Sequence, residues 1–140
     1  MGFFDKIFGS KAAATKFSGQ KMTVLAPIDS TVIPLEQLPD ETFATAILGP
    51  GCGLEPTDDM VYAPFDGTVT TIADTLHAVG LMSDDGIEVL IHVGMDTVEM
   101  QGKSFEAQVK VDQKVKAGTP LLKIDLDAIR AAGHPTATAL

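Results

Sequence analysis

The chain has 140 residues and a formal net charge of −9; hydrophobic residues make up 45% of it and aromatic residues 6%. This length predicts one domain with a true hydrophobic core. The acidic balance argues against nucleic acid as a partner, because a phosphate backbone attracts basic surfaces, and it favours a basic protein partner. The single cysteine, Cys52, excludes an internal disulfide and suits a reducing cytoplasm.

The first 21 residues differ from the rest in charge, because they hold four lysines and one aspartate. Four apolar residues among them follow helical spacing: Phe3, Phe4, Ile7 and Phe8. A short basic amphipathic helix of this kind can touch an anionic membrane surface, and a plain disordered leader is the alternative. We therefore expect a flexible basic leader over residues 1–21 and a domain over residues 22–140. The start has no secretion signal, so the expected location is cytoplasmic, peripheral to the inner membrane face where the leader binds.

A short motif occurs twice in the domain, as APIDSTVI at residues 26–33 and as APFDGTVT at residues 63–70. In each copy, proline ends one extended segment, Asp-Ser or Asp-Gly makes a turn, and Thr-Val begins the next strand. A shorter turn–strand–turn–strand echo lies over residues 111–122. Duplication of small β motifs predicts an all-β fold: an antiparallel barrel or sandwich with only short helices.

Two short helices are expected within this β framework. The first follows Asp40, whose side chain can cap a helical turn, and precedes the glycine-rich run GPGCG at residues 49–53. The second lies over residues 125–133 and is closed by Gly133. Residues 134–140 should be extended.

The domain is organised around a predicted β-hairpin over residues 77–93. Asp85 and Gly86 suit the two central positions of a type I′ turn. With this two-residue loop Val79 lies opposite His92, and His77 and His92 share one face of the hairpin as diagonal neighbours. A three-residue loop would send the two histidines to opposite faces, so their convergence depends on the turn.

Two converging imidazoles suit three kinds of chemistry. They can hold part of a zinc site, act as acid and base near neutral pH, or transfer a group, one as nucleophile and the other as hydrogen-bond donor. A structural role for both histidines is the fourth option. The remaining histidine, His134, lies in a Gly-His-Pro turn, and the residue types alone do not choose among these options.

Two runs around the histidines carry a resemblance: TLHAV at residues 75–79 and LIHVGMDTVE at residues 90–99. They resemble the glucose-type enzyme IIA component of the bacterial phosphoenolpyruvate-dependent sugar phosphotransferase system, and the likeness extends over about residues 24–129. The resemblance implies an all-β sandwich or barrel. It also implies that the phosphocarrier protein HPr delivers a phosphoryl group to His92 and that a IIB domain of a membrane transporter takes it for the incoming sugar.

The resemblance also implies roles for further residues. His77 would hydrogen-bond the phosphoryl oxygens, and Thr75 would orient the His77 imidazole. No metal, nucleotide or other cofactor is implied, although the two histidines could form a weak zinc pair. The expected partner-binding residues around the histidines are Asp40, Phe43, Ile47, Leu48, Asp96, Val98 and Glu99. For Phe43, Ile47 and Leu48 the alternative is ordinary core, and for the acidic residues it is a solvated loop.

The chain departs from the family in two respects. Many members have phenylalanine where this chain has Ala73 and Leu90. This difference changes the shape of the apolar surface that is expected around the two histidines. Members also continue beyond the position of Leu140 with residues that complete the sheet, so this chain is either a shortened form or an unusual member. A sheet left incomplete there would have an open edge, which is prone to pairing and aggregation.

Two other functions are alternatives to the phosphocarrier interpretation. The first is a regulatory binding protein whose phosphorylation state is read by other proteins. The second is a zinc hydrolase on a related β scaffold, which would need a third ligand near His77 and His92.

Overall fold

The computed structural model describes residues 23–140, so the predicted leader lies outside the described residues. Along the chain the elements are β1 (Ser30–Pro34), η2 (Leu35–Gln37), α1 (Glu41–Ala44), β2 (Cys52–Pro56), β3 (Met60–Tyr62), β4 (Gly67–Ile72), β5 (Ala78–Ser83), β6 (Glu88–His92), η3 (Thr97–Met100), β7 (Phe105–Ala107), β8 (Lys114–Val115), β9 (Pro120–Ile124), α2 (Leu126–Ala131) and β10 (Thr138–Ala139).

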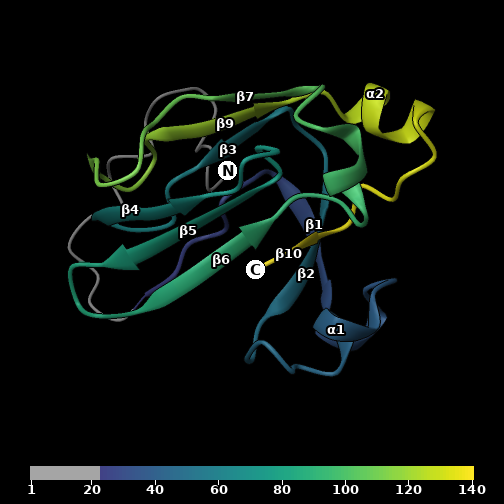
Figure 1. The fold of residues 1–140 in the computed structure, drawn as a ribbon. Coiled ribbons are helices and arrows are strands. Elements are labelled where there is room, and N and C mark those ends of the chain that lie inside the picture. Colours follow the sequence, from purple (N-terminus) through teal and green to yellow (C-terminus); the bar gives the residue numbers. More distant parts are fainter. Residues whose placement is uncertain (1–22) are drawn as a thin grey trace.

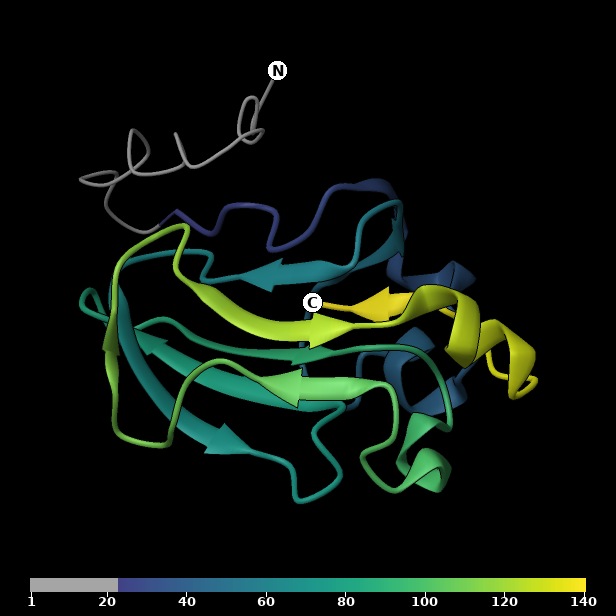
Figure 2. The same ribbon diagram turned by 90° about the horizontal axis from the view of Figure 1, so that it is seen from above.

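The strands form two antiparallel sheets that face each other (Figure 1). The larger sheet has the order β1-β2-β10-β6-β5-β4-β8, and the smaller has the order β3-β9-β7. The view from above shows the small sheet covering the large one (Figure 2). This arrangement confirms the predicted all-β sandwich with only short helices. None of the helices within residues 23–140 is long and apolar enough to cross a membrane.

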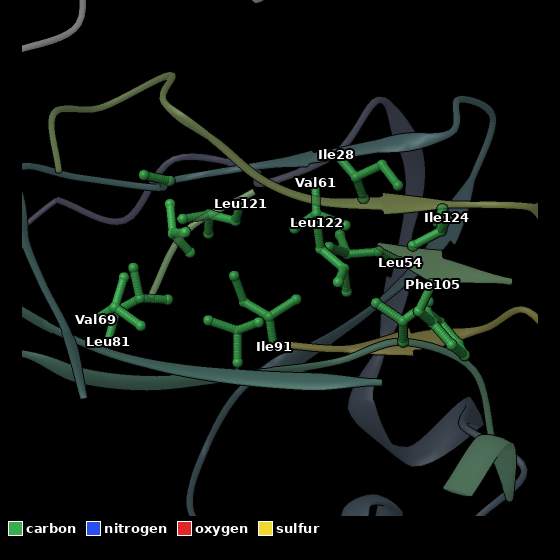
Figure 3. Close-up of a cluster of buried hydrophobic side chains, with 14 of the residues drawn as sticks. Ile28, Leu54, Val61, Val69, Leu81, Ile91, Phe105, Leu121, Leu122 and Ile124 are labelled. Atoms are coloured by element: carbon green, nitrogen blue, oxygen red, sulfur yellow. The ribbon is translucent and has the colours of Figure 1, made fainter. Parts of the chain in front are cut away.

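The core fills the space between the two sheets (Figure 3). The small sheet contributes Leu121 and Leu122, which are fully buried, and the large sheet contributes Val69, Leu81 and Ile91. Burying one such side chain stabilises the fold by about 1.5–3 kcal/mol. In β9 the buried Leu122 and Ile124 alternate with the exposed Lys123, and the neighbouring Leu121 lies where the register with β3 shifts between Val61 and Tyr62.

The residue that precedes each copy of the repeated motif binds the proline of the other copy. The Leu25 N–H donates to the Pro64 carbonyl at 2.9 Å, and the Tyr62 N–H donates to the Pro27 carbonyl at 2.6 Å. Both prolines therefore accept in this reciprocal pair of bonds, although neither has an N–H to donate. The third, shorter echo joins the second copy, because the Ala63 N–H donates to the Thr119 carbonyl at 2.8 Å. Backbone hydrogen bonds thus join the three related segments to one another.

The hairpin forms, but the predicted register is wrong by one residue. Ala78 lies opposite His92 and Val79 opposite Ile91, so the loop has three residues. The Ser83 N–H donates to the Ile87 carbonyl at 2.8 Å, and the Ser83 hydroxyl accepts from the Ile87 N–H at 2.9 Å. Gly86 has a φ of 93°, whereas Asp85 has no positive φ, so a type I′ turn is absent. Val79 therefore packs into the core with Ile91, and not on a face shared with His92.

The last strand lies inside the large sheet. Strand β10 pairs with β2 through Thr138↔Leu54 and Ala139↔Gly53, and with β6 through Ala139↔His92. Residues 138–139 therefore have a strand on each side. This placement also fixes the backbone of His92 between β5 and β10.

Both helices begin at the predicted aspartates. The Asp40 carboxylate accepts the Thr42 N–H at 2.9 Å, and the Asp125 carboxylate accepts the Ala128 N–H at 3.0 Å. In both views α1, α2 and η3 gather at one end of the sandwich, opposite the tip of the β5–β6 hairpin (Figures 1 and 2). Because β6 runs from the hairpin tip toward this end, its last residue, His92, lies at the same end of the sandwich.

Candidate active site

His92 is the last residue of strand β6. A hydrogen bond to a backbone carbonyl determines which of its two ring nitrogens carries the hydrogen. Its Nδ1 lies 2.9 Å from the Gly94 carbonyl oxygen. A carbonyl oxygen can only accept a hydrogen bond, so Nδ1 must carry the hydrogen. In the neutral ring the lone pair is therefore on Nε2, the nitrogen that Gly94 does not bind. Gly94 has a φ of 72°, a conformation that glycine adopts without steric cost.

His77 lies directly before strand β5 and is 8% exposed. Its Nδ1 lies 2.7 Å from the Thr75 hydroxyl oxygen. A hydroxyl can donate or accept, so this contact permits either tautomer of His77. When Thr75 donates to Nδ1, the hydrogen of the neutral His77 ring is on Nε2 and can be given to a ligand.

The two imidazole rings meet edge to face, with centroids 4.7 Å apart and planes at 80°. In the observed register a regular strand would point His77 into the core, because His77 would lie opposite Val93. His77 lies outside the regular strand, however, and follows Leu76, which has a φ of 62°. Left-handed backbone is uncommon for a bulky residue and breaks the alternation of side chains at this point. The predicted convergence thus occurs by a different route from the predicted one.

Both imidazoles have a lowered pKa. Burial lowers the pKa of His77, the neighbouring His92 lowers it further, and a hydrogen bond to the Thr75 backbone opposes this shift. Burial also lowers the pKa of His92, while the Gly94 hydrogen bond, Asp40 and Asp96 act to raise it. The net shifts keep both rings neutral at pH 7. A neutral imidazole is the form that has a nucleophilic lone pair.

Helix α1 supplies a wall for this site. The Phe43 ring lies with its centroid 4.9 Å from that of His92. Asp40 caps the same helix, so it holds Phe43 in place and also contributes negative charge near His92. The structure therefore puts Asp40 and Phe43 beside the histidine pair.

The other expected partner-binding residues lie on the surface. Ile47 is 74% exposed, Leu48 62% and Val98 51%, so these three residues are not core. Asp96 and Glu99 are also exposed, next to Val98. A cavity of about 510 Å³ lies alongside and is lined by residues that include Phe43, Leu48, Leu90 and Cys52. The structure therefore leaves Ile47, Leu48, Asp96, Val98 and Glu99 accessible to a partner.

Metal binding by the pair would need further ligands. Across the described residues 23–140, no group of three or more His, Cys, Asp or Glu side chains is arranged to hold a metal ion. His134 lies after α2, where its N–H donates to the Ile129 carbonyl at 3.2 Å. The donor set around His77 and His92 therefore does not match a catalytic zinc site, which takes three protein ligands.

Sequence reasoning missed two residues that shape the site, Gly94 and Leu76. Gly94 supplies the carbonyl that orients His92, and a glycine two residues after a candidate nucleophile was a signal for a turn with positive φ. Leu76 gave no such signal, because leucine rarely adopts a left-handed conformation.

Known proteins resemble this chain in sequence and in structure. The family described as phosphoenolpyruvate-dependent sugar phosphotransferase system, EIIA 1, matches residues 22–140. A PTS system glucose-specific EIICBA component from Staphylococcus saprophyticus is 48% identical over 120 residues, which are 86% of this chain and 18% of that protein. This chain thus spans less than a fifth of that relative. The structure of glucose permease IIA from Mycoplasma capricolum matches with a TM-score of 0.79 and 36% identity, over 85% of this chain and 78% of that one.

The family match covers all of the described residues, and the structural match has the same β-sandwich fold. The function expected from the sequence is thereby confirmed at the level of the family. The chain belongs to the EIIA 1 family of the phosphoenolpyruvate-dependent sugar phosphotransferase system, and it is a phosphocarrier that acts through a phosphohistidine.

Proposed function

We propose that His92 is the residue that carries the phosphoryl group, received from HPr and passed to the IIB domain of a sugar transporter. Glucose is the sugar we propose, since both relatives are named for it. One observation carries the assignment to His92. Its Nδ1 is occupied by the Gly94 carbonyl, which leaves the Nε2 lone pair for attack beside a second imidazole.

In the proposed transfer, the Nε2 lone pair of His92 attacks the phosphorus of phospho-HPr. The bond between phosphorus and the HPr donor atom breaks, and its electron pair leaves with HPr. The hydrogen on Nδ1 stays on His92, where the Gly94 carbonyl stabilises the positive charge that develops on the ring. His77 donates from Nε2 to a phosphoryl oxygen while Thr75 donates to its Nδ1. Such preorganised donors are the usual means of stabilising a phosphoryl group in transfer.

The exposed residues near the pair are the proposed docking surface. Ile47, Leu48 and Val98 would pack against the partner, while Asp96 and Glu99 would meet its basic groups. Asp40 and Phe43 would lie at the inner edge of this contact, next to His92. We propose that regulatory proteins use the same surface, because a phosphoryl group on His92 would change the charge at its centre.

His92→Ala should abolish labelling by radioactive phospho-HPr, because the variant lacks the accepting nitrogen. His134→Ala is the matched control, because His134 is the third histidine of the chain and lies outside the His77–His92 pair. The measurement is acid-labile phosphate per protein, with circular dichroism to verify folding. A folded His92→Ala protein that is labelled as fast as His134→Ala would disprove the assignment.

His77→Gln should accept phosphate from HPr but pass it on at least about tenfold more slowly to the IIB domain of a glucose transporter. Glutamine retains an amide donor that can serve the accepting step, but it lacks the imidazole that Thr75 orients, and this orientation matters most when charge shifts between the two proteins in onward transfer. Rapid-quench measurement of each half-reaction separates the two steps. Equal slowing of both would indicate that His77 is merely structural.

Asp40→Asn should lower the pKa of His92 further. Asparagine still caps α1, so the change removes the negative charge that raises this pKa while keeping the helix. Because the pKa of wild-type His92 already lies below its ordinary value of about 6.5, labelling should be lost only below that pH. In the variant the loss should occur at still lower pH. An NMR titration of the His92 ring checks this, and an upward shift would contradict the role given to Asp40.

We also propose that the basic leader contacts the membrane from the cytoplasmic side, on the basis of its four lysines and apolar stripe. A lysine near an anionic surface contributes about 1 kcal/mol, and salt screens this attraction. Deleting residues 1–18 should therefore reduce sedimentation with anionic vesicles at low salt and leave labelling of His92 intact. Equal sedimentation of both proteins would exclude this contact.

A further inference from the structure

Thr97 is buried and polar, and the transfer chemistry above does not use it. It begins η3 and is 0% exposed. Its hydroxyl donates to the Val93 carbonyl at 2.5 Å, across the turn that follows His92. A buried hydroxyl is costly unless it is hydrogen-bonded, so this bond indicates a specific demand on the turn.

Thr97 also contacts Gly94 on its other side. A Cβ atom on Gly94 would lie 2.5 Å from the Thr97 methyl carbon Cγ2 and 2.9 Å from the Pro135 carbonyl oxygen. Both distances are too short for carbon, so the turn closes tightly around Gly94. Thr97 thus bonds the residue before Gly94 and packs against Gly94 itself.

The two peptide planes that flank Gly94 are each held by one bond. Thr97 holds the Val93–Gly94 plane through the Val93 carbonyl. The Met95 N–H donates to the Pro135 carbonyl at 3.1 Å and so holds the Gly94–Met95 plane. Because a peptide unit is planar, the second bond also sets the direction of the Gly94 carbonyl, which accepts from His92 Nδ1. Fixing both planes fixes φ and ψ of Gly94.

We propose that Thr97 is a positioning residue for His92. By holding the Val93 carbonyl, Thr97 fixes φ of Gly94. Together with the Met95–Pro135 bond, which fixes ψ, this keeps the Gly94 carbonyl aimed at Nδ1 and so keeps the His92 lone pair on Nε2. Its effect on phosphoryl transfer rests on the proposed role of His92. Its effect on the tautomer does not, because the tautomer is a property of the unphosphorylated protein.

The test is Thr97→Val, which has nearly the same shape but no hydroxyl. In ¹⁵N-labelled protein, the imidazole spectrum of His92 should show a larger fraction of the Nε2–H tautomer. Labelling by phospho-HPr should slow about three- to tenfold, the factor expected for one lost hydrogen bond. Thr97→Ser keeps the donor and loses only the methyl group, so it should retain the wild-type tautomer.

Thr138→Val is the matched control, since Thr138 is also 0% exposed and its hydroxyl donates to the Thr136 carbonyl at 3.0 Å. This control should leave the His92 tautomer unchanged. Should Thr97→Val not fold, Thr97→Ala removes the same donor without placing a methyl group at the Val93 carbonyl. A folded donor-free variant with the wild-type tautomer, or an equal change in Thr138→Val, would overturn the proposal. Failure of the His92 assignment would appear separately, as labelling that survives His92→Ala.

Discussion

On the proposed assignment of the phosphoryl group to His92, the hydrogen bond from His92 Nδ1 to the Gly94 carbonyl is the interaction on which the chemistry depends. It selects which ring nitrogen has the lone pair, and it sets where the ring points. Its acceptor exists only because the backbone reverses at Gly94, whose φ of 72° ends the strand. A tight turn and a nucleophilic nitrogen are therefore two results of one local backbone geometry.

The rest of the sandwich holds this turn in place from both sides. Strand β5 pairs with β6 along its length, and β10 pairs at His92 itself. The segment that leads into β10 supplies the Pro135 carbonyl to Met95, so the end of the chain supports the turn as well as the strand. The small sheet and its core of Leu121, Leu122 and Ile124 keep the large sheet packed beneath the site. The position of the His92 ring thus depends on residues that are distant from it in the sequence.

Much of the fold followed from local patterns in the sequence. The repeated APxD motifs predicted the antiparallel assembly, and Asp40 and Asp125 predicted the helix starts. These features depend on turn and capping preferences that operate over a few residues.

The hairpin register did not follow, because two turn types fit the sequence from Ser83 to Gly86. The observed loop is chosen by the Ser83 hydroxyl, which binds the Ile87 N–H, and by the burial of Val79 with Ile91. Nor could the approach of the two rings be derived from alternation, since it depends on the left-handed Leu76. Tertiary packing stabilises that conformation, and propensity argues against it.

The same burial that orients the pair also limits its charge. Two protonated imidazoles with centroids 4.7 Å apart would repel each other, and His92 indeed lowers the pKa of His77. Near neutral pH both rings of the unphosphorylated pair are therefore uncharged. A phosphoryl group on His92 would add negative charge at this place, which reverses the sign of the field at His77 and favours its protonated form. On the proposed assignment, His77 would bind the phosphoryl oxygens most strongly when the group is on His92 and would lose that advantage when it departs. The close approach of the rings thus links the protonation state of His77 to whether His92 carries a phosphoryl group.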